Sequence, residues 1–316
     1  MEPIVVTLTG PTAAGKTAVA CALADLIPCA LISMDSAMVY RGMDIGTAKP
    51  TADERKRYPH ALIDIRDPAQ SYSAADFVAD ADREIDAALR KGLLPVVVGG
   101  TMLYARAFRE GLANLPSADA GIRSVIERDA RERGWAALHA ELTQVDPRAA
   151  RLIHPNNPQR LQRALEVYRA TGKPLSEWWD EQTPADTRVR LGVRLREFAV
   201  TVSERHILHE RIAERFRRML AAGFEAEVSA LLKREDLGPE LPSMRAVGYR
   251  QMWSYLNGEV GAEQMCESTI AATRQLAKKQ LTWLRAWPHV RVLEGDAGAL
   301  ARQIARTAVE DGVHGG

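Results

Sequence analysis

The hydrophobic positions of this chain form short runs that alternate with segments of helical periodicity. The runs are residues 4–8, Ala30–Met34, Ala61–Ile65 and Leu94–Val98, followed much later by two more, within 191–202 and at Val290–Leu293. Apolar runs of this length, rich in β-branched residues and separated by helical segments, are typical of strands buried in a parallel sheet. We therefore predict an α/β core in which helices cover both faces of a parallel sheet.

The alternation stops in the middle of the chain. Between about 112 and 188 every periodic segment is helical, and one helix has clear boundary signals. Asn157 and Pro158 are typical of a helix start, whereas Gly172 and Pro174 are typical of its end. We predict a discontinuous core of residues 1–111 and 189–316, interrupted by an all-helical insertion of residues 112–188. Residues 203–287 are predicted to form mostly long helices of the core.

Composition excludes several classes of protein. Of the 316 residues 46% are hydrophobic, and 42 Lys and Arg against 41 Asp and Glu leave a net charge of +1, so nucleic-acid binding would have to rest on local patches. Cys21, Cys29 and Cys266 lack the spacing of metal ligands or of a disulfide set. No apolar run approaches the roughly 18 residues of a membrane span, and the chain enters a strand too early for a signal peptide. We expect a soluble, cytoplasmic protein without membrane contact.

The first apolar run leads into a glycine-rich loop. In "LTGPTAAGKTAVA", residues 8–20, the pattern G-x-x-x-x-G-K-[ST] lies between a strand-like run and a helical segment. Such a loop surrounds an oligophosphate with backbone N–H groups, the lysine supplies positive charge, and the hydroxyl side chain binds Mg²⁺. The predicted phosphate-binding residues are Gly10, Pro11, Thr12, Ala13, Ala14, Gly15, Lys16 and Thr17, with Thr17 as the metal ligand. The loop predicts a bound diphosphate or triphosphate, such as the nucleotide ATP, without saying which.

The usual acidic residue of a phosphoryl-transfer enzyme is missing. The buried run "LPVVV" ends in Gly99, Gly100 and Thr101 rather than in a carboxylate. The only acid in a comparable position is Asp35, directly after Ala30–Met34. From position alone Asp35 has three possible roles, as a helix cap, as a support for Mg²⁺, or as a base toward a substrate beside the phosphates.

Four segments together resemble a known family. "GPTAAGKT", "DSAMVYRGMDIGTAKP", "VGGTMLY" and "LPSMRAVGYRQMW", in this order and spacing, are similar to the tRNA dimethylallyltransferase family, the bacterial tRNA isopentenyltransferases. The resemblance implies a kinase-like P-loop core and a helical insertion that binds the anticodon stem-loop of tRNA. It implies transfer of a dimethylallyl group from dimethylallyl diphosphate to N6 of the adenine on the 3′ side of the anticodon. The phosphate loop would then hold a leaving diphosphate, which accounts for the missing acid.

The resemblance also implies roles for single residues. Lys16 and the loop would stabilise the departing diphosphate, Thr17 would hold Mg²⁺, and Asp35 would accept the proton of the adenine amine. Thr101 matches a threonine near diphosphate, although it could equally cap the helix that follows. Arg215 matches an arginine that reaches the diphosphate, although its stripe with Arg211 and Arg218 could be an ordinary solvated face.

Two basic segments could bind RNA. Between Arg148 and Lys173 there are six Lys or Arg residues against the single acid Glu166, and Arg274–Arg291 contains five basic residues and two tryptophans without any acid. Either could be plain basic surface, and Trp283 and Trp287 are more typical of core packing than of base stacking. The tRNA contacts implied by the resemblance are Asp35, Ser36, Ala37, Met38, Thr101, Arg123, Gln159, Arg160, Leu161, Gln162, Arg163, Pro242, Ser243, Met244, Arg245, Ala246 and Val247.

Two alternative functions share parts of this pattern. A nucleotide or small-molecule kinase would have the same loop but would transfer a γ-phosphate. An RNA-binding regulator would need the basic patches but not Asp35, and would release no diphosphate. We favour a prenyltransferase, which we expect to act as a monomer.

Overall fold

The structure, a computed structural model, describes residues 2–112, 115–116, 119–181 and 185–310. The chain divides into two compact units, one formed by Met1–Glu110 with Asp186–Gly316 and the other by Gly111–Ala185. We call the first the core unit and the second the helical unit. Each is described by itself.

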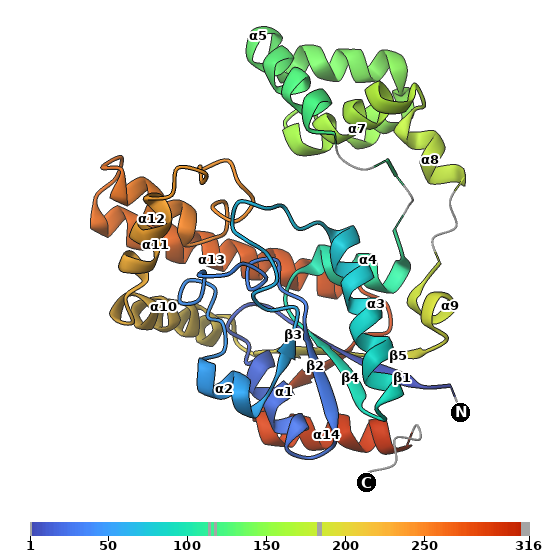
Figure 1. The fold of residues 1–316 in the computed structure, drawn as a ribbon, viewed down its shortest axis with the longest axis vertical. Coiled ribbons are helices and arrows are strands. Elements are labelled where there is room, and N and C mark those ends of the chain that lie inside the picture. Colours follow the sequence, from blue (N-terminus) through green and yellow to red (C-terminus); the bar gives the residue numbers. More distant parts are fainter. Residues whose placement is uncertain (1, 113–114, 117–118, 182–184, 311–316) are drawn as a thin grey trace. The chain divides into compact units, whose positions relative to one another are not determined.

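The core unit contains one sheet of parallel strands (Figure 1). The strands are β1 (Ile4–Thr9), β2 (Cys29–Ser33), β3 (His60–Ala61), β4 (Leu94–Val98), β5 (Arg194–Thr201) and β6 (Arg291–Glu294). They lie in the order β3-β2-β4-β1-β5-β6, so β1, with its phosphate loop, lies between β4 and β5. The carboxyl ends of β1, β2 and β4 therefore lie next to one another, where a parallel sheet places its binding crevice.

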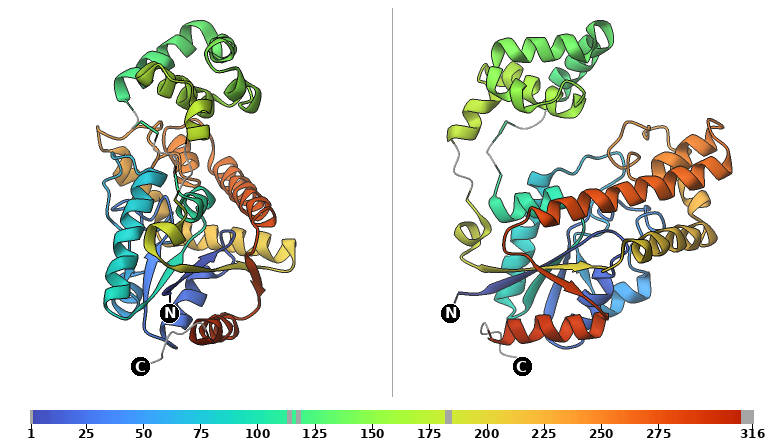
Figure 2. Two further views of the ribbon diagram at one scale, coloured as in Figure 1. Left: turned by 90° about the vertical axis from the view of Figure 1, so that its right-hand side faces the viewer. Right: turned by 180° about the vertical axis from the view of Figure 1, so that it is seen from behind.

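Helices cover both faces of this sheet, as Figure 2 shows. The helices of the core unit are α1 (Lys16–Ala24), α2 (Ala52–Arg57), α3 (Ala74–Arg90), α4 (Met102–Glu110), α9 (Thr187–Leu191), α10 (Arg205–Ala221), α11 (Phe224–Leu232), α12 (Tyr249–Leu256), α13 (Ala262–Arg285) and α14 (Ala297–Glu310). Neighbouring residues of β1 point to opposite faces. Val6 belongs to an apolar cluster that includes residues of α1 and α14, whereas Val5 belongs to a cluster that includes residues of α3, α4 and α10–α12. The predicted α/β fold is thus confirmed.

One predicted strand is largely wrong. Only Ala61 of the run Ala61–Ile65 belongs to a strand, because Leu62 and Asp64 adopt left-handed backbone angles, with φ of 63° and 57°. Asp64 instead turns toward two cations, Lys49, whose Nζ lies 2.6 Å from Oδ1, and Arg55. Apolar alternation alone could not reveal this ion-pair cluster.

The helical unit has its own apolar core. It contains α5 (Ala120–Val145), α6 (Pro147–Leu152), α7 (Pro158–Thr171) and α8 (Leu175–Glu181). The predicted boundaries of α7 are confirmed: Asn157 Oδ1 accepts the N–H of Arg160, and Gly172 ends the helix at φ 70°. Parts of the predicted insertion, residues 113–114, 117–118 and 182–184, lie outside the described residues. No helix in the described part of the chain has both the length and the apolar character of a membrane span.

Candidate active site

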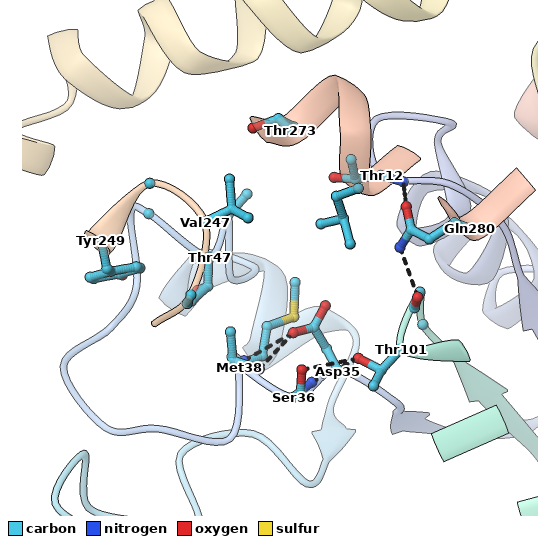
Figure 3. A pocket seen from close by; sticks show the side chains of 18 of the residues that line it. Thr12, Asp35, Ser36, Met38, Thr47, Thr101, Val247, Tyr249, Thr273 and Gln280 are labelled. Carbon is cyan, nitrogen blue, oxygen red and sulfur yellow. Dashed lines mark hydrogen bonds between the residues drawn. The ribbon is translucent and has the colours of Figure 1, made fainter. Parts of the chain in front are cut away.

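A cavity of about 640 Å³ opens at the carboxyl ends of β1, β2 and β4. Its lining brings together the three segments that the sequence singled out, the phosphate loop, Asp35–Met38 and Gly99–Thr101. Figure 3 shows Thr12, Asp35 and Thr101 around one open space. All lining residues belong to the core unit.

The phosphate loop has the backbone of an anion-binding turn. Gly10, Ala13 and Gly15 have positive φ angles of 147°, 64° and 96°. A side chain at Gly10 would meet the carbonyl oxygen of Val200 at 2.2 Å, so the turn requires glycine there. Ala14 is buried at 5% exposure, which limits its contribution to its backbone. Lys16 begins α1 and donates from Nζ to the carbonyl of Pro11 at 2.8 Å.

Two cations line this end of the cavity without a carboxylate partner among the described residues. Lys16 and Arg215 both lie in the lining, and neither forms an ion pair there. Burial, the nearby Arg215 and, in the opposite direction, Asp35 together lower the pKa of Lys16 to about 8. Burial also lowers the pKa of Arg215, which Asp35 partly offsets. Both side chains are half-buried and neither forms an ion pair among the described residues, so the two positive charges are suited to bind an anion.

Hydrogen bonds hold Arg215 in place on α10. Its guanidinium donates to the carbonyl of Thr47 at 3.2 Å and to Oγ1 of Thr12 at 3.4 Å. Arg211 and Arg218 of the same predicted stripe are exposed. The stripe is therefore not a uniform face, because only Arg215 reaches the cavity.

Asp35 caps a turn rather than a helix. Its Oδ1 accepts the backbone N–H groups of Ala37 at 2.8 Å and Met38 at 3.3 Å, and the next helix, α2, begins only at Ala52. Figure 3 shows both bonds. The second carboxylate oxygen, Oδ2, has no hydrogen-bond partner in the described residues, and the residue lines the cavity. A carboxylate fixed through one oxygen keeps the other available as a proton acceptor.

Thr101 joins two of the loops. Its Oγ1 accepts the N–H of Ser36 at 3.0 Å and lies 3.3 Å from the Ser36 hydroxyl. Its carbonyl accepts the N–H of Ala105, so Thr101 also stands at the start of α4. Its side chain serves the active-site loop, not the helix.

The described parts of the tRNA-contact segments divide into cavity residues and core residues. Pro242, Arg245, Ala246 and Val247 line the cavity. Ser243 and Met244 are fully buried, and the Ser243 hydroxyl donates to the carbonyl of Pro68 at 2.7 Å. Neither side chain reaches the surface, so RNA contact at Ser243 and Met244 stays a prediction that would have to involve their backbone.

The helical unit gives a similar division. Gln159 and Arg160 are exposed on the first turn of α7, and Gln162 is half-buried. Leu161 is fully buried in the unit's core, so RNA contact at this position stays a prediction that would have to involve its backbone. Arg123 and Arg163 both lie near the carboxylate of Glu166, at 3.2 Å and 3.5 Å, and Glu166 is only 1% exposed. These two arginines thus have a structural partner in addition to any RNA role.

Several residues of the cavity lining were not among the predicted site residues. Gln280 of α13 accepts the N–H of Thr12 at 2.9 Å and donates to the carbonyl of Gly100 at 2.7 Å, so it ties the phosphate loop to the loop after β4. Phe216, Met219, Phe224 and Tyr249 form an apolar wall. Gln280 lies inside the basic segment Arg274–Arg291, and no local pattern distinguishes this neutral residue from its charged neighbours. Trp283 and Trp287 are both half-buried and packed, and Trp283 also lines the cavity.

Thr17 is the predicted metal ligand and lies exposed on the cavity lining at the first turn of α1. No group of three or more His, Cys, Asp or Glu residues suited to a metal occurs in the described ranges. The donor set fits an ion held mainly by phosphate oxygens and water, as is common for Mg²⁺.

Comparisons with known proteins identify the family of this chain. The family model described as IPP transferase matches residues 38–287, well over half of the chain. A tRNA isopentenylpyrophosphate transferase from Bacillus halodurans is 37% identical over 98% of both chains, with a TM-score of 0.69. A tRNA delta(2)-isopentenylpyrophosphate transferase from Staphylococcus epidermidis is 30% identical, with a TM-score of 0.70, over 98% of this chain and 100% of its own.

A eukaryotic dimethylallyltransferase described as acting on tRNA shares the fold. It has a TM-score of 0.79 and 24% identity, over 98% of this chain and 77% of its own. The resemblance found in the sequence motifs is confirmed by the family match and the two more similar relatives, and the chain belongs to the IPP transferase family.

Proposed function

We propose that this protein transfers the dimethylallyl group of dimethylallyl diphosphate to N6 of the adenine 3′-adjacent to the anticodon in tRNA. Family membership supports prenyl transfer to tRNA as the class of reaction. The identity of the prenyl group and of the target base rests on the motif resemblance and on the shape of the site.

One observation carries the proposal. Lys16 and Arg215, two cations without an ion-pair partner in the described residues, line the same cavity as Asp35. Only one carboxylate oxygen of Asp35 accepts hydrogen bonds from the described residues. The cations suit the diphosphate, and the carboxylate suits a neutral nucleophile that becomes acidic as it reacts. The apolar wall of Phe216, Met219, Phe224 and Tyr249 suits a short hydrocarbon.

The proposed step breaks one bond and forms another. The amine nitrogen N6 attacks the allylic carbon, the carbon–oxygen bond to diphosphate breaks, and its electron pair leaves with the diphosphate. Lys16, Arg215 and the N–H groups of the phosphate loop stabilise that growing charge. Asp35 accepts the proton that N6 loses. Thr101 keeps Ser36 and the loop of Asp35 in position through the bonds described above.

Mg²⁺ would be held by Thr17 together with the diphosphate, and when bound it would supply additional positive charge.

For tRNA, we propose that Asp35–Met38, Thr101, Pro242 and Arg245–Val247 contact the target nucleotide at the cavity. Arg123 and the exposed side chains of Gln159 and Arg160, with the half-buried Gln162 and Arg163, would contact the stem-loop. Unstacking one base costs a few kcal/mol and is least costly in a single-stranded loop, which favours the anticodon loop over a duplex. A tRNA acceptor also favours the cytoplasm as the place of reaction.

The test is a transfer assay without ATP. The purified protein is incubated with unmodified tRNA, Mg²⁺ and dimethylallyl diphosphate labelled in the prenyl group, and the RNA is then digested to nucleosides. We expect the label in an N6-alkylated adenosine. A parallel reaction with labelled ATP tests the alternatives. A protein that leaves the RNA unlabelled in the first assay but consumes ATP in the second would be a kinase, and one that binds tRNA without either reaction would be a regulator.

A further inference from the structure

The carboxylate of Glu227 lies at the centre of a cluster of hydrogen bonds beside the cavity. Glu227 is on α11, and its Oε2 accepts the backbone N–H groups of Asp44 at 2.8 Å and Ile45 at 2.7 Å. Its Oε1 accepts the N–H of Gly46 at 3.1 Å and the hydroxyl of Tyr249 at 2.5 Å. One side chain thus binds consecutive N–H groups of a loop that is far away in sequence.

The loop held in this way is packed tightly against aromatic rings. A side chain on Gly46 would meet the ring of Phe224 at 2.2 Å and the ring of Tyr249 at 2.6 Å. The rings of Phe224 and Tyr249 contact each other edge to face, with centroids 5.1 Å apart. Gly46, Phe224 and Tyr249 all line the cavity, so a displacement of this loop would change the wall of the site.

The next residue of the loop carries the effect to a cation. The carbonyl of Thr47 accepts a hydrogen bond from Arg215 at 3.2 Å, and the Thr47 hydroxyl donates to the carbonyl of Met43 at 2.7 Å. Arg215 has only one other hydrogen bond in the described residues, to Thr12 in the phosphate loop at 3.4 Å. The position of its guanidinium therefore depends on where the loop places the Thr47 carbonyl.

We propose that Glu227 is a positioning residue for the diphosphate site, acting through Thr47 on Arg215. The inference rests on the proposed function for its biological meaning, but its physical content concerns only the binding of an anion. Without the carboxylate, the N–H groups of Asp44, Ile45 and Gly46 lose their acceptor, and the loop has to shift to find another. Arg215 then loses the carbonyl that orients it.

A double-mutant cycle tests this inference with inorganic diphosphate and Mg²⁺ as the probe. Glu227→Gln keeps the shape but presents an NH₂ group toward donors, and calorimetry should show affinity falling about tenfold, equal to roughly 1.4 kcal/mol. In an Arg215→Ala background the same Glu227→Gln change should have almost no further effect, because the residue through which it acts is gone. Glu225→Gln, an exposed glutamate in the same helical turn, is the matched control and should bind diphosphate like wild type.

Each outcome decides between a positioning role and a purely structural one. A structural role would lower the unfolding temperature but leave the two losses of affinity independent. Equal losses in both backgrounds, or no loss in either, would overturn the proposal. If Glu227→Gln does not fold, Glu227→Asp, which retracts the carboxylate by one methylene group, gives the same cycle. Because the probe needs neither tRNA nor a prenyl donor, the result stands apart from the transfer assay that tests the function.

Discussion

At the scale of single residues, the site combines groups whose ordinary properties are altered by their surroundings. Burial and Arg215 lower the pKa of Lys16 to about 8, so this amine loses its proton at a pH where an exposed lysine keeps it. Affinity for a diphosphate depends on the protonated form. The chemical behaviour of Lys16 thus follows from its neighbours as much as from the loop pattern.

This gives a pH prediction. The pH dependence of kcat/KM reports the pKa values of the enzyme before it binds substrate. For dimethylallyl diphosphate, kcat/KM should therefore fall as the pH rises through about 8, because the neutral Lys16 amine no longer attracts the anion. In Lys16→Arg the guanidinium stays protonated, so the fall should move to higher pH even if overall activity is lower. Initial rates at low donor concentration between about pH 6 and 10, a range that brackets the pKa of Lys16 and stays below that of an arginine, measure this. An identical descending limb in both proteins would show that another group titrates.

The role of Asp35 is a second prediction at this scale. In Asp35→Asn the amide oxygen can still accept the N–H groups of Ala37 and Met38, so the turn should persist. The amide cannot accept a proton, and the single-turnover rate should fall by about 10²–10⁴, while the affinities for tRNA and diphosphate change much less. Partial recovery at high Mg²⁺ would instead assign Asp35 to the metal, and transfer within a few fold of wild type would leave it no role as base.

At the scale of helices and strands, the pattern of hydrophobic and capping residues predicted most secondary-structure elements but not the contacts between distant side chains. The buried runs of β1 and β4 and the cap of α7 at Asn157 were readable because strand burial and capping are local properties. Asp64, which was predicted to lie in a strand, instead forms ion pairs with Lys49 and Arg55. No local pattern of hydrophobic and polar residues predicts these pairs. The roles of Glu227 and Gln280 could not be predicted for the same reason, because their hydrogen-bond partners lie far away in sequence.

The first turns of α7 give a prediction that separates RNA binding from stability. Arg160 is exposed, so Arg160→Ala should leave unfolding unchanged and reduce the slope of log affinity for tRNA against log salt by about 0.7–0.9 if it contacts one phosphate. Arg163 lies beside the buried Glu166 and donates to the carbonyl of Pro116 at 2.6 Å, so Arg163→Ala should cost about 1–3 kcal/mol of stability. Salt titrations and thermal unfolding of both variants provide the comparison. A stable Arg163→Ala protein would mean that Glu166 does not need this partner.

At the scale of the whole molecule, the division of the chain into two compact units suggests that the core unit can fold without the helical unit. Where the insertion leaves and re-enters the core unit, the Thr187 hydroxyl donates to the carbonyl of Phe108, and Arg190 donates to the same carbonyl at 3.1 Å. These bonds lie within the core unit, so its chain ends are held together without the helical unit. A short glycine–serine linker in place of residues 111–185 should therefore give a folded protein.

This linker variant should still bind inorganic diphosphate, because every lining residue of the cavity lies in the core unit. It should lose most of its affinity for tRNA if the helical unit binds the stem-loop. Calorimetry with diphosphate and filter binding with tRNA give the two readings. Undiminished tRNA binding would contradict the assignment of the stem-loop contacts to Arg123 and the start of α7.

The proposed function requires that the phosphate loop holds a leaving group and not a phosphoryl donor. The direct test uses dimethylallyl diphosphate with ¹⁸O at the oxygen that bridges carbon and phosphorus, together with tRNA, and mass spectrometry of the products. If the carbon–oxygen bond breaks as proposed, the ¹⁸O leaves with the diphosphate and the prenylated adenosine contains none. Recovery of the ¹⁸O in dimethylallyl alcohol, with unlabelled diphosphate or diphosphorylated RNA, would mean that the phosphorus–oxygen bond breaks and would contradict the proposed function.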